Sequence, residues 1–325
     1  MTQINPGLVL PVLAAFAISA VLGPIIIPML KKWHFGATER EEGPQSHLKK
    51  SGTPAMGGLI FLSAVLVVSL VYMRDYPKIL PVLLTTFGFG LVGFMDDFIK
   101  FARHRSEGLT PKQKMLGQFV VTLAFIAYYY ISRDGDMSML IPFGGGSYLV
   151  LGWVGIPVAF LAILGTVNAV NFTDGIDGLS ASVTSVVAAF FTVASLVLDG
   201  GNHPITCALM GGLMGYLLYN VYPAKVFMGD TGSLAMGGFV VSAAYMLELP
   251  IFILIVGLVY WAELISVMLQ VTYFKATHGK RLFRMTPIHH HFELGGWSET
   301  RIVAVFTITT IMLALIGFAA LPLQA

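Results

Sequence analysis

Charge is what this 325-residue sequence has least of. Only 11% of its residues are charged, while 56% are hydrophobic, and soluble domains carry roughly 25% charged residues. This scarcity excludes a soluble globular protein and predicts an integral membrane protein. The formal net charge is +2, and we expect no nucleic-acid partner.

Cysteine is scarce, and we expect neither a P-loop nor a cleavable signal. The single Cys207 excludes an internal disulfide framework and a thiolate metal cluster, and we interpret it as a small apolar residue inside a span. The glycine-rich segment around Asp230 lacks the G-x-x-x-x-G-K-[ST] pattern. Since the first basic residue, Lys31, follows the first apolar run, we expect an uncleaved first span with its N-terminus outside.

Long apolar runs fill most of the chain. A helix needs about 20 mostly apolar residues to cross a membrane, and only helices or closed barrels satisfy the backbone in lipid. Runs without period-2 alternation favour helices. The sequence therefore predicts one all-α polytopic domain over residues 1–325, with spans at 8–30, 54–73, 79–95, 113–131, 149–170, 179–198, 204–221, 233–247, 250–273 and 302–322.

The basic residues orient these ten expected helices. All but three of the 19 lysines and arginines lie on the loops that follow odd-numbered spans; the exceptions are Arg74, Lys78 and Arg133. The positive-inside rule then places those loops in the cytoplasm and both termini on the extracytoplasmic side. We expect a multi-pass membrane protein.

Four polar segments, which we call the polar islands, interrupt the apolar sequence. They are residues 96–97, 168–178, 229–232 and 287–293. Carboxylates and amides beside membrane spans are unfavourable unless they serve a purpose. All four islands fall on the expected cytoplasmic side, and we predict that they form one active site there.

The first island is an adjacent pair of acids, Asp96 and Asp97. On a continuing helix, Lys100 can reach either one, because it lies four and three residues further on. Adjacent carboxylates repel unless a cation or a shared proton relieves them. The pair is either a base or nucleophile beside a cation site, or an acidic helix end solvated at the interface.

The second island combines two acids with two amides. Asp174 and Asp177 are three residues apart and would share one face of a helix. Asn168 and Asn171 add amides at the same spacing. A polar helix cap is the alternative interpretation, but it explains only one or two of these residues.

The third island surrounds Asp230 with glycine, threonine and serine. This composition suits a loop entering a helix, whose free N–H groups can bind an anion. Asp230 is a good Mg²⁺ ligand when phosphate oxygens complete the shell. The alternative is a simple turn with a capping aspartate.

The fourth island contains three consecutive histidines, His289, His290 and His291. In a loop, two of them can converge. A zinc site is weakly supported, because no cysteine helps and the H-E-x-x-H arrangement is absent. We favour phosphate binding or proton transfer by one or two of them. Among the basic residues, Lys112 at a helix start is the one least explained by topology.

Together the islands indicate Mg²⁺-assisted chemistry on a phosphate carried by a lipid. A proton-coupled transporter is the alternative from a different class, and its best support is Glu263 within the ninth expected span. Against a transporter, the chain shows no repeated halves. A structural scaffold would not need so many acids at one face.

Nine motifs carry a resemblance to a known family. They are R-E-E-G-P at 40–44, H-L-K-K at 47–50, S-G-T-P-A-M-G-G at 51–58, D-D-F-I-K at 96–100, L-T-P-K-Q-K at 109–114, the second island, P-A-K-V-F-M-G-D-T-G-S at 223–233, P-I-H-H-H-F-E at 287–293 and G-W-S-E at 296–299. The chain resembles the polyprenyl-phosphate N-acetylhexosamine-1-phosphate transferases over its whole length. G-T-P-x-M-G-G and P-x-H-H-H-x-E favour the muramoyl-pentapeptide branch over the N-acetylglucosamine-phosphate branch, and Ala55, where the family often has threonine, is a mild departure.

The resemblance implies a reaction and a set of roles. UDP-MurNAc-pentapeptide and undecaprenyl phosphate would give lipid I and UMP, with Mg²⁺, in a homodimer embedded in membrane lipid. Direct attack with Asp97 as base is favoured over a phospho-enzyme, and both remain open. By position, the resemblance implies Asp230 as the metal ligand and, with Asp96, Asp97, Lys112 and His289, as a catalytic group. The expected substrate-binding groups are Thr53, Lys100, Asn168, Asn171, Asp174, Asp177, Asn220, Phe227, His290 and His291.

Overall fold

The computed structural model describes residues 6–33, 52–103 and 107–322. Within these ranges the fold is almost entirely helical, as expected. The helices are α1 Pro6–Lys32, α3 Gly58–Tyr72, α4 Ile79–Ala102, α5 Pro111–Ser132, α6 Gly155–Thr173, α7 Leu179–Val197, α8 His203–Asn220, α9 Gly229–Met246, α10 Ile253–Val256, α11 Leu258–Ala276, α12 Ile288–Glu293 and α13 Glu299–Ala319. Short 3-10 turns lie at Gly152–Val154 and Pro250–Phe252, and strands β1 Met139–Leu140 and β2 Tyr148–Leu149 pair antiparallel.

Every expected span coincides with a helical segment. Six of these segments are long and apolar enough to cross a membrane, so the protein is a multi-pass membrane protein. The other segments are shorter, less apolar or broken, and the number of ten spans stays a prediction. The motifs at 40–44 and 47–50, together with Ser51, lie outside the described residues.

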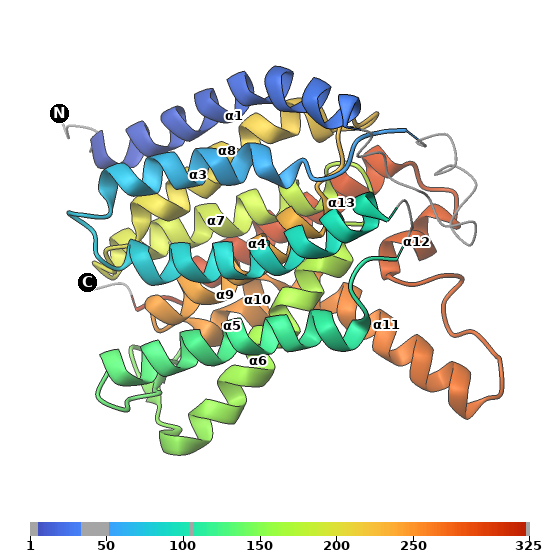
Figure 1. The fold of residues 1–325 in the computed structure, drawn as a ribbon. Coiled ribbons are helices and arrows are strands. Elements are labelled where there is room, and N and C mark those ends of the chain that lie inside the picture. The colour runs from blue at the N-terminus through green and yellow to red at the C-terminus, as the bar shows by residue number, and fades with distance from the viewer. Residues whose placement is uncertain (1–5, 34–51, 104–106, 323–325) are drawn as a thin grey trace.

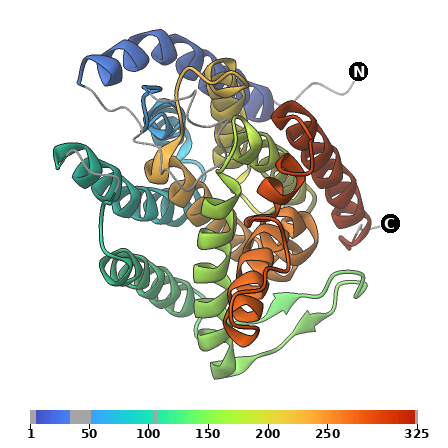
Figure 2. The ribbon, with the colours of Figure 1, turned by 90° about the vertical axis from the view of Figure 1, so that its right-hand side faces the viewer.

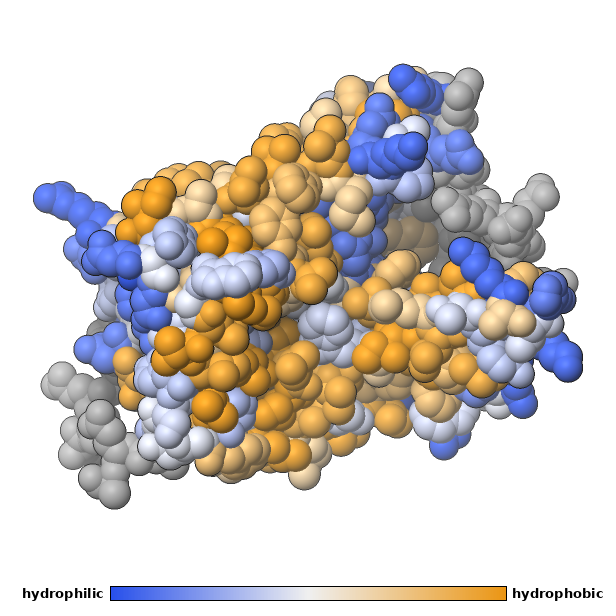
Figure 3. Space-filling view, turned by 90° about the horizontal axis from the view of Figure 1, so that it is seen from below, coloured by the Kyte–Doolittle hydropathy of each residue, from blue (hydrophilic) through white to orange (hydrophobic). Residues whose placement is uncertain are grey.

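The helices run between two hydrophilic ends. The start of α1 and the end of α13 lie at one end of the molecule, and α12 lies at the other (Figure 1). On the face seen in Figure 3, the surface between the ends is predominantly apolar. This arrangement agrees with termini on one side and polar islands on the opposite side, while the assignment of the sides to cytoplasm and exterior stays a prediction.

The contact between α4 and α9 forms the centre of the bundle. Gly93 of α4 has no side chain, and a Cβ there would lie 2.0 Å from the carbonyl oxygen of Asp230. On α3, a Cβ at Gly58 would lie 2.4 Å from Cα of Gly232. Small residues let membrane helices approach closely, and here they bring the start of α9 against the end of α4.

The ninth expected span is broken rather than continuous. Residues Pro250–Val256 and Leu258–Ala276 meet at an angle of 81° around Gly257. After the bend, α11 leaves the bundle and projects from it (Figure 1). Seen from the end that carries α12, α11 lies on one side of α6, and α4 and α5 lie on the other (Figure 2).

Gly93→Ala should destabilise the protein, because the added methyl collides with the backbone of α9. Overpacking of a tight site costs typically about 1–3 kcal/mol. The thermal unfolding midpoint of the purified protein in detergent measures the loss. Gly88→Ala on the same helix is the control, since the atoms nearest its Cβ would belong to the side chain of Val121, the first at 3.0 Å, and not to the backbone of another helix. Equal midpoints for the two variants would contradict the packing argument.

Candidate active site

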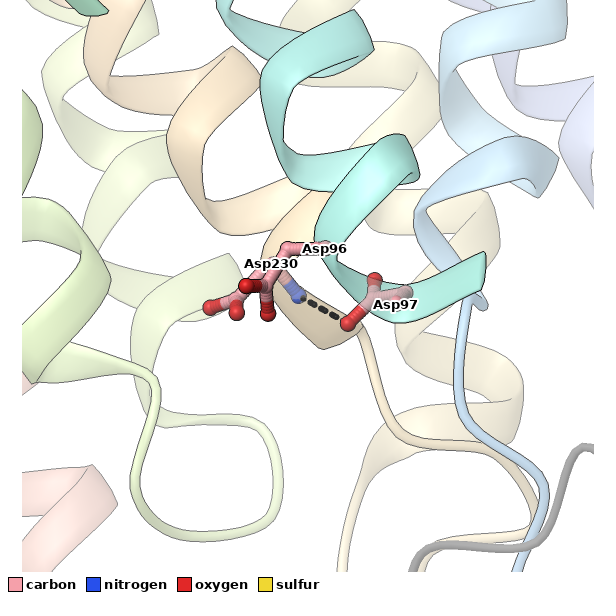
Figure 4. A group of neighbouring side chains, drawn as sticks. All are labelled: Asp96, Asp97 and Asp230. Carbon is pink, nitrogen blue, oxygen red and sulfur yellow. Dashed lines mark hydrogen bonds between the residues drawn. The ribbon is translucent and has the colours of Figure 1, made fainter. Parts of the chain in front are cut away.

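Three acids from two distant segments meet at one end of the bundle. Asp96 and Asp97 lie near the end of α4, and Asp230 lies in the first turn of α9 (Figure 4). One carboxylate oxygen of each lies within 4.8 Å of the others. Because α4 continues through its two acids, the expected helical spacing to Lys100 is confirmed.

Asp97 holds the start of α9. The first N–H groups of a helix have no partner within it, and Asp97 accepts from those of Asp230 at 3.2 Å and Thr231 at 2.9 Å. The hydroxyl of Thr231 donates to the same carboxylate at 2.7 Å. Its negative charge also complements the positive end of the helix dipole. Both oxygens of Asp97 are therefore engaged in fixing α9.

Two lysines neutralise part of this acidic cluster. The Lys100 ammonium lies 2.5 Å from Asp96, 2.8 Å from Asp230 and 3.5 Å from Asp97. Lys114, from the first turns of α5, lies 3.1 Å from the same oxygen of Asp230. Asp96 in addition accepts a backbone hydrogen bond from Leu109 at 2.8 Å, which fixes the chain just before α5.

The amide of Asn171 joins the second island to the cluster. It donates to Asp230 at 2.8 Å and to the hydroxyl of Ser233 at 2.7 Å. Asn168, nearly one turn earlier on α6, instead pairs with the buried Gln118 of α5 at 2.8 Å. Of the two expected amides, the structure therefore brings only Asn171 to the acids.

The turn between α6 and α7 differs from the helical interpretation of the second island. Helix α6 ends at Thr173, and Gly178 takes a left-handed conformation before α7 begins. Asp177 accepts from the backbone of Ala224 at 2.9 Å. Asp174 is half-buried. Burial raises the pKa of Asp174 to about 8, with a further increase from Asp230 and other neighbouring acids, so at neutral pH its carboxyl can donate a hydrogen bond.

The loop that leads into α9 is pinned on two sides. Asn220 accepts from Gly178 at 3.1 Å and donates to the carbonyl of Val226 at 2.9 Å. On the other side, the backbone of Phe227 exchanges hydrogen bonds with Pro54 and Gly57, each 2.8 Å long. The half-buried Phe227 is therefore held next to the segment that carries Thr53, which is also half-buried.

The histidine island is a short helix, α12, and the expectation of a loop is wrong. Each ring has a different environment. His289 is fully buried and lies 3.0 Å from Glu263 of α11, while His290 lies 3.1 Å from Glu293. His291 accepts from the backbone of Arg284 at 3.1 Å and so holds the preceding loop. A helix separates consecutive side chains by about 100°, which is why the three rings diverge.

Sequence reasoning named Lys112 and missed Lys114. Lys112 is exposed at the start of α5, whereas Lys114 reaches Asp230. A capping box between Thr110 and Gln113 fixes where α5 begins. From that start, Lys114 and the buried Gln118 are four residues apart and share the inward face. This pattern was available in the sequence.

The acidic cluster has the chemistry of a site for a hard divalent cation. Its donors are carboxylate oxygens, which Mg²⁺ prefers. The group holds no sulfur or imidazole donor, so a zinc site is not indicated for it. Lys100 and Lys114 beside it can bind phosphate oxygens. The fold and this centre define a multi-pass membrane protein equipped to handle phosphate esters.

Comparison with known proteins identifies the family. A family model described as glycosyl transferase family 4 matches residues 79–248. The phospho-N-acetylmuramoyl-pentapeptide-transferase of Acetivibrio thermocellus is 47% identical over 95% of this chain and 94% of that protein. Proteins of the same name from Clostridium botulinum and Caldicellulosiruptor bescii are 48% and 44% identical, over 98% and 97% of this chain and 98% of each of those proteins. The chain therefore belongs to the phospho-N-acetylmuramoyl-pentapeptide-transferases, within glycosyl transferase family 4, and the resemblance seen in the sequence is confirmed.

Thr231→Val should loosen the start of α9, because it removes the hydroxyl that donates to Asp97. Hydrogen bonds to charged groups contribute about 1.5–3 kcal/mol. We expect a lower thermal unfolding midpoint and a matching loss of activity. Thr309→Val is the control, since the Thr309 hydroxyl only bonds the carbonyl of Val305 within exposed helix. A Thr231→Val protein with the midpoint of the control would show that the hydroxyl bond to Asp97 does not help to anchor α9.

Proposed function

We propose that this protein transfers phospho-MurNAc-pentapeptide from UDP-MurNAc-pentapeptide to undecaprenyl phosphate. The products are lipid I and UMP, and the reaction is the first membrane step of peptidoglycan synthesis. The observation that carries the proposal is the 44–48% identity to transferases of this name over nearly the whole chain. The acidic and basic centre at one end of the helices supports it.

In the proposed reaction, an oxygen of the lipid phosphate attacks the sugar-bearing phosphorus of the nucleotide substrate. A new P–O bond forms, and the bond to the UMP phosphate breaks. The second pKa of a phosphate monoester is about 6, as it is for phosphorylated side chains. The attacking oxygen is then already ionised at neutral pH, so direct attack requires no base.

This chemistry assigns different roles to the three acids. For Asp97, expected as the base, we propose a role in fixing α9, because both of its oxygens accept hydrogen bonds from the start of that helix. Asp230 and Asp96 are the residues that would hold Mg²⁺, with Asn171 orienting Asp230. An ion held there would offset negative charge on the diphosphate. Lys100 and Lys114 offset further charge on the phosphate oxygens.

The nucleoside end of the substrate would lie beyond the diphosphate, along the turn after α6 and the loop before α9. Phe227 offers a ring on which uracil can stack. Asp174 can donate a hydrogen bond, and Asp177 and Asn220 hold the loop in place. Thr53 lies on the segment that pairs with the Phe227 loop. The resemblance assigns Lys112, Asn168, His290 and His291 to the substrate site as well.

The location and assembly are part of the same proposal. The protein lies in the bacterial plasma membrane with this centre facing the cytoplasm, where its nucleotide substrate is found, and it forms a homodimer. The positive-inside distribution of lysine and arginine supports the orientation. Light scattering of the detergent-solubilised protein measures the assembly.

The deciding experiment is release of UMP by the purified protein in detergent, given both substrates and Mg²⁺. A transferase needs no sealed compartment, whereas a transporter does. Glu263, the best sequence support for a transporter, is fully buried against His289. No UMP release, together with counterflow in liposomes, would overturn the proposal. Release with UDP-N-acetylglucosamine but not with the muramoyl substrate would favour the relative that transfers N-acetylglucosamine phosphate.

Asp230→Asn should lower kcat by about 100-fold or more, the scale seen when a pre-organised electrostatic partner of the reacting group is lost. Removing Mg²⁺ with EDTA should stop the wild-type reaction, and added Mg²⁺ should restore it. Asp75→Asn is the control, since Asp75 is exposed in the loop between α3 and α4. Normal Mg²⁺ dependence in the Asp230→Asn variant would remove Asp230 from the metal site.

A further inference from the structure

The buried pair of Glu263 and His289 has no role in the proposed chemistry so far. Glu263 lies on α11 after the bend, and His289 lies in the first turn of α12. Both side chains are fully buried. One oxygen of Glu263 lies 3.0 Å from Nδ1 of His289 and accepts the backbone N–H of the same residue at 3.3 Å. Two contacts to one carboxylate oxygen fix where α12 begins.

Stability alone gives little reason for this pair. A buried ion pair is seldom more stabilising than apolar residues of the same volume, because both groups lose their hydration. Here the other oxygen of Glu263 and both ring nitrogens of His289 lack an aligned hydrogen-bond partner within the described part of the chain. Unsatisfied buried polar groups are rare and call for an explanation.

The position of the His289 imidazole ring explains why the pair is present. Its second nitrogen, Nε2, presses against the backbone of Gly175, where a Cβ would lie only 2.2 Å away. Gly175 lies between Asp174 and Ile176 in the turn that follows α6. The contacts therefore run from Glu263 to His289 and from His289 to the turn that carries Asp174 and Asp177.

His289 is fully enclosed in this arrangement, so it acts on the turn rather than on a ligand. Its ring fills the space that a side chain at position 175 would occupy, and only glycine leaves room for it. The far end of the turn is held separately, because Glu299 of α13 accepts from the backbone of Asp177 at 3.3 Å. The turn is thus clamped between α12 and α13.

We infer that Glu263 is a positioning residue that acts through His289 to set the turn carrying Asp174 and Asp177, and thereby sets affinity for the nucleotide substrate. The inference rests on the proposed function, which puts this turn beside the nucleoside. Because both side chains are fully buried, water does not compete for the contact between Glu263 and His289. Both the charge and the length of the Glu263 side chain are needed, since one of its oxygens contacts both the ring and the backbone N–H of His289.

Steady-state kinetics with each substrate varied in turn test the inference. Glu263→Gln removes the charge and should raise KM for the nucleotide substrate by about tenfold, equivalent to 1.4 kcal/mol, with KM for the lipid phosphate unchanged. Glu263→Asp keeps the charge and should recover part of the affinity. Ser266→Ala on the same helix is the matched control, because it removes a buried hydroxyl that bonds only the backbone of Glu263.

A second set of variants probes the contact from the side of Gly175. It tests the inference even if the Glu263→Gln protein does not fold. Gly175→Ala should raise KM for the nucleotide in the wild-type background. In a His289→Ala background the same change should have little effect, because the ring that it collides with is gone. Likewise, Glu263→Gln should add little to His289→Ala if Glu263 acts through His289.

Three outcomes are distinguishable. Wild-type protein without UMP release rejects the proposed function itself. An active wild type with Glu263→Gln that lowers the unfolding midpoint but leaves the nucleotide KM unchanged overturns the inference, since the pair is then only structural. Additive effects of Glu263→Gln and His289→Ala, or of Gly175→Ala and His289→Ala, also overturn it.

Discussion

The contact between the Asp97 carboxylate and the first N–H groups of α9 is the constraint on which the rest of the site depends. It brings the end of α4 against the start of α9, and Gly93 leaves room for that approach. Asp230 is one of the residues whose backbone N–H bonds Asp97, so this contact also sets the position of Asp230. A helix start inside a membrane protein needs such an acceptor, because water is scarce there.

Positive charge makes this concentration of acids tolerable. Lys100 contacts all three carboxylates, and Lys114 adds a second ammonium at Asp230. Like charges this close could not all remain ionised without cations nearby. The same lysines suit a substrate with two phosphates, since an ammonium group can pair with a phosphate oxygen as well as with a carboxylate.

A second polar layer lies outside the acidic centre. His291 and Gln270 hold the loop between α11 and α12 by backbone hydrogen bonds, and Asn220 holds the loop before α9. These residues share an amide or imidazole that bonds the main chain. Several residues that the sequence suggests as ligand-binding are thus engaged in shaping the loops, because backbone N–H and C=O groups outside helices need hydrogen-bond partners.

The sequence by itself determined the class, the family, the approximate spans and the clustering of the four islands at one end, because apolar length, charge asymmetry and motifs are local properties. Tertiary structure decided which members of each island meet. It selected Lys114 beside the acids, placed Asn171 rather than Asn168 at Asp230, broke the ninth span at Gly257 and paired Glu263 with His289. Those choices depend on helix rotation and on contacts between segments far apart in the chain, and a local pattern contains neither.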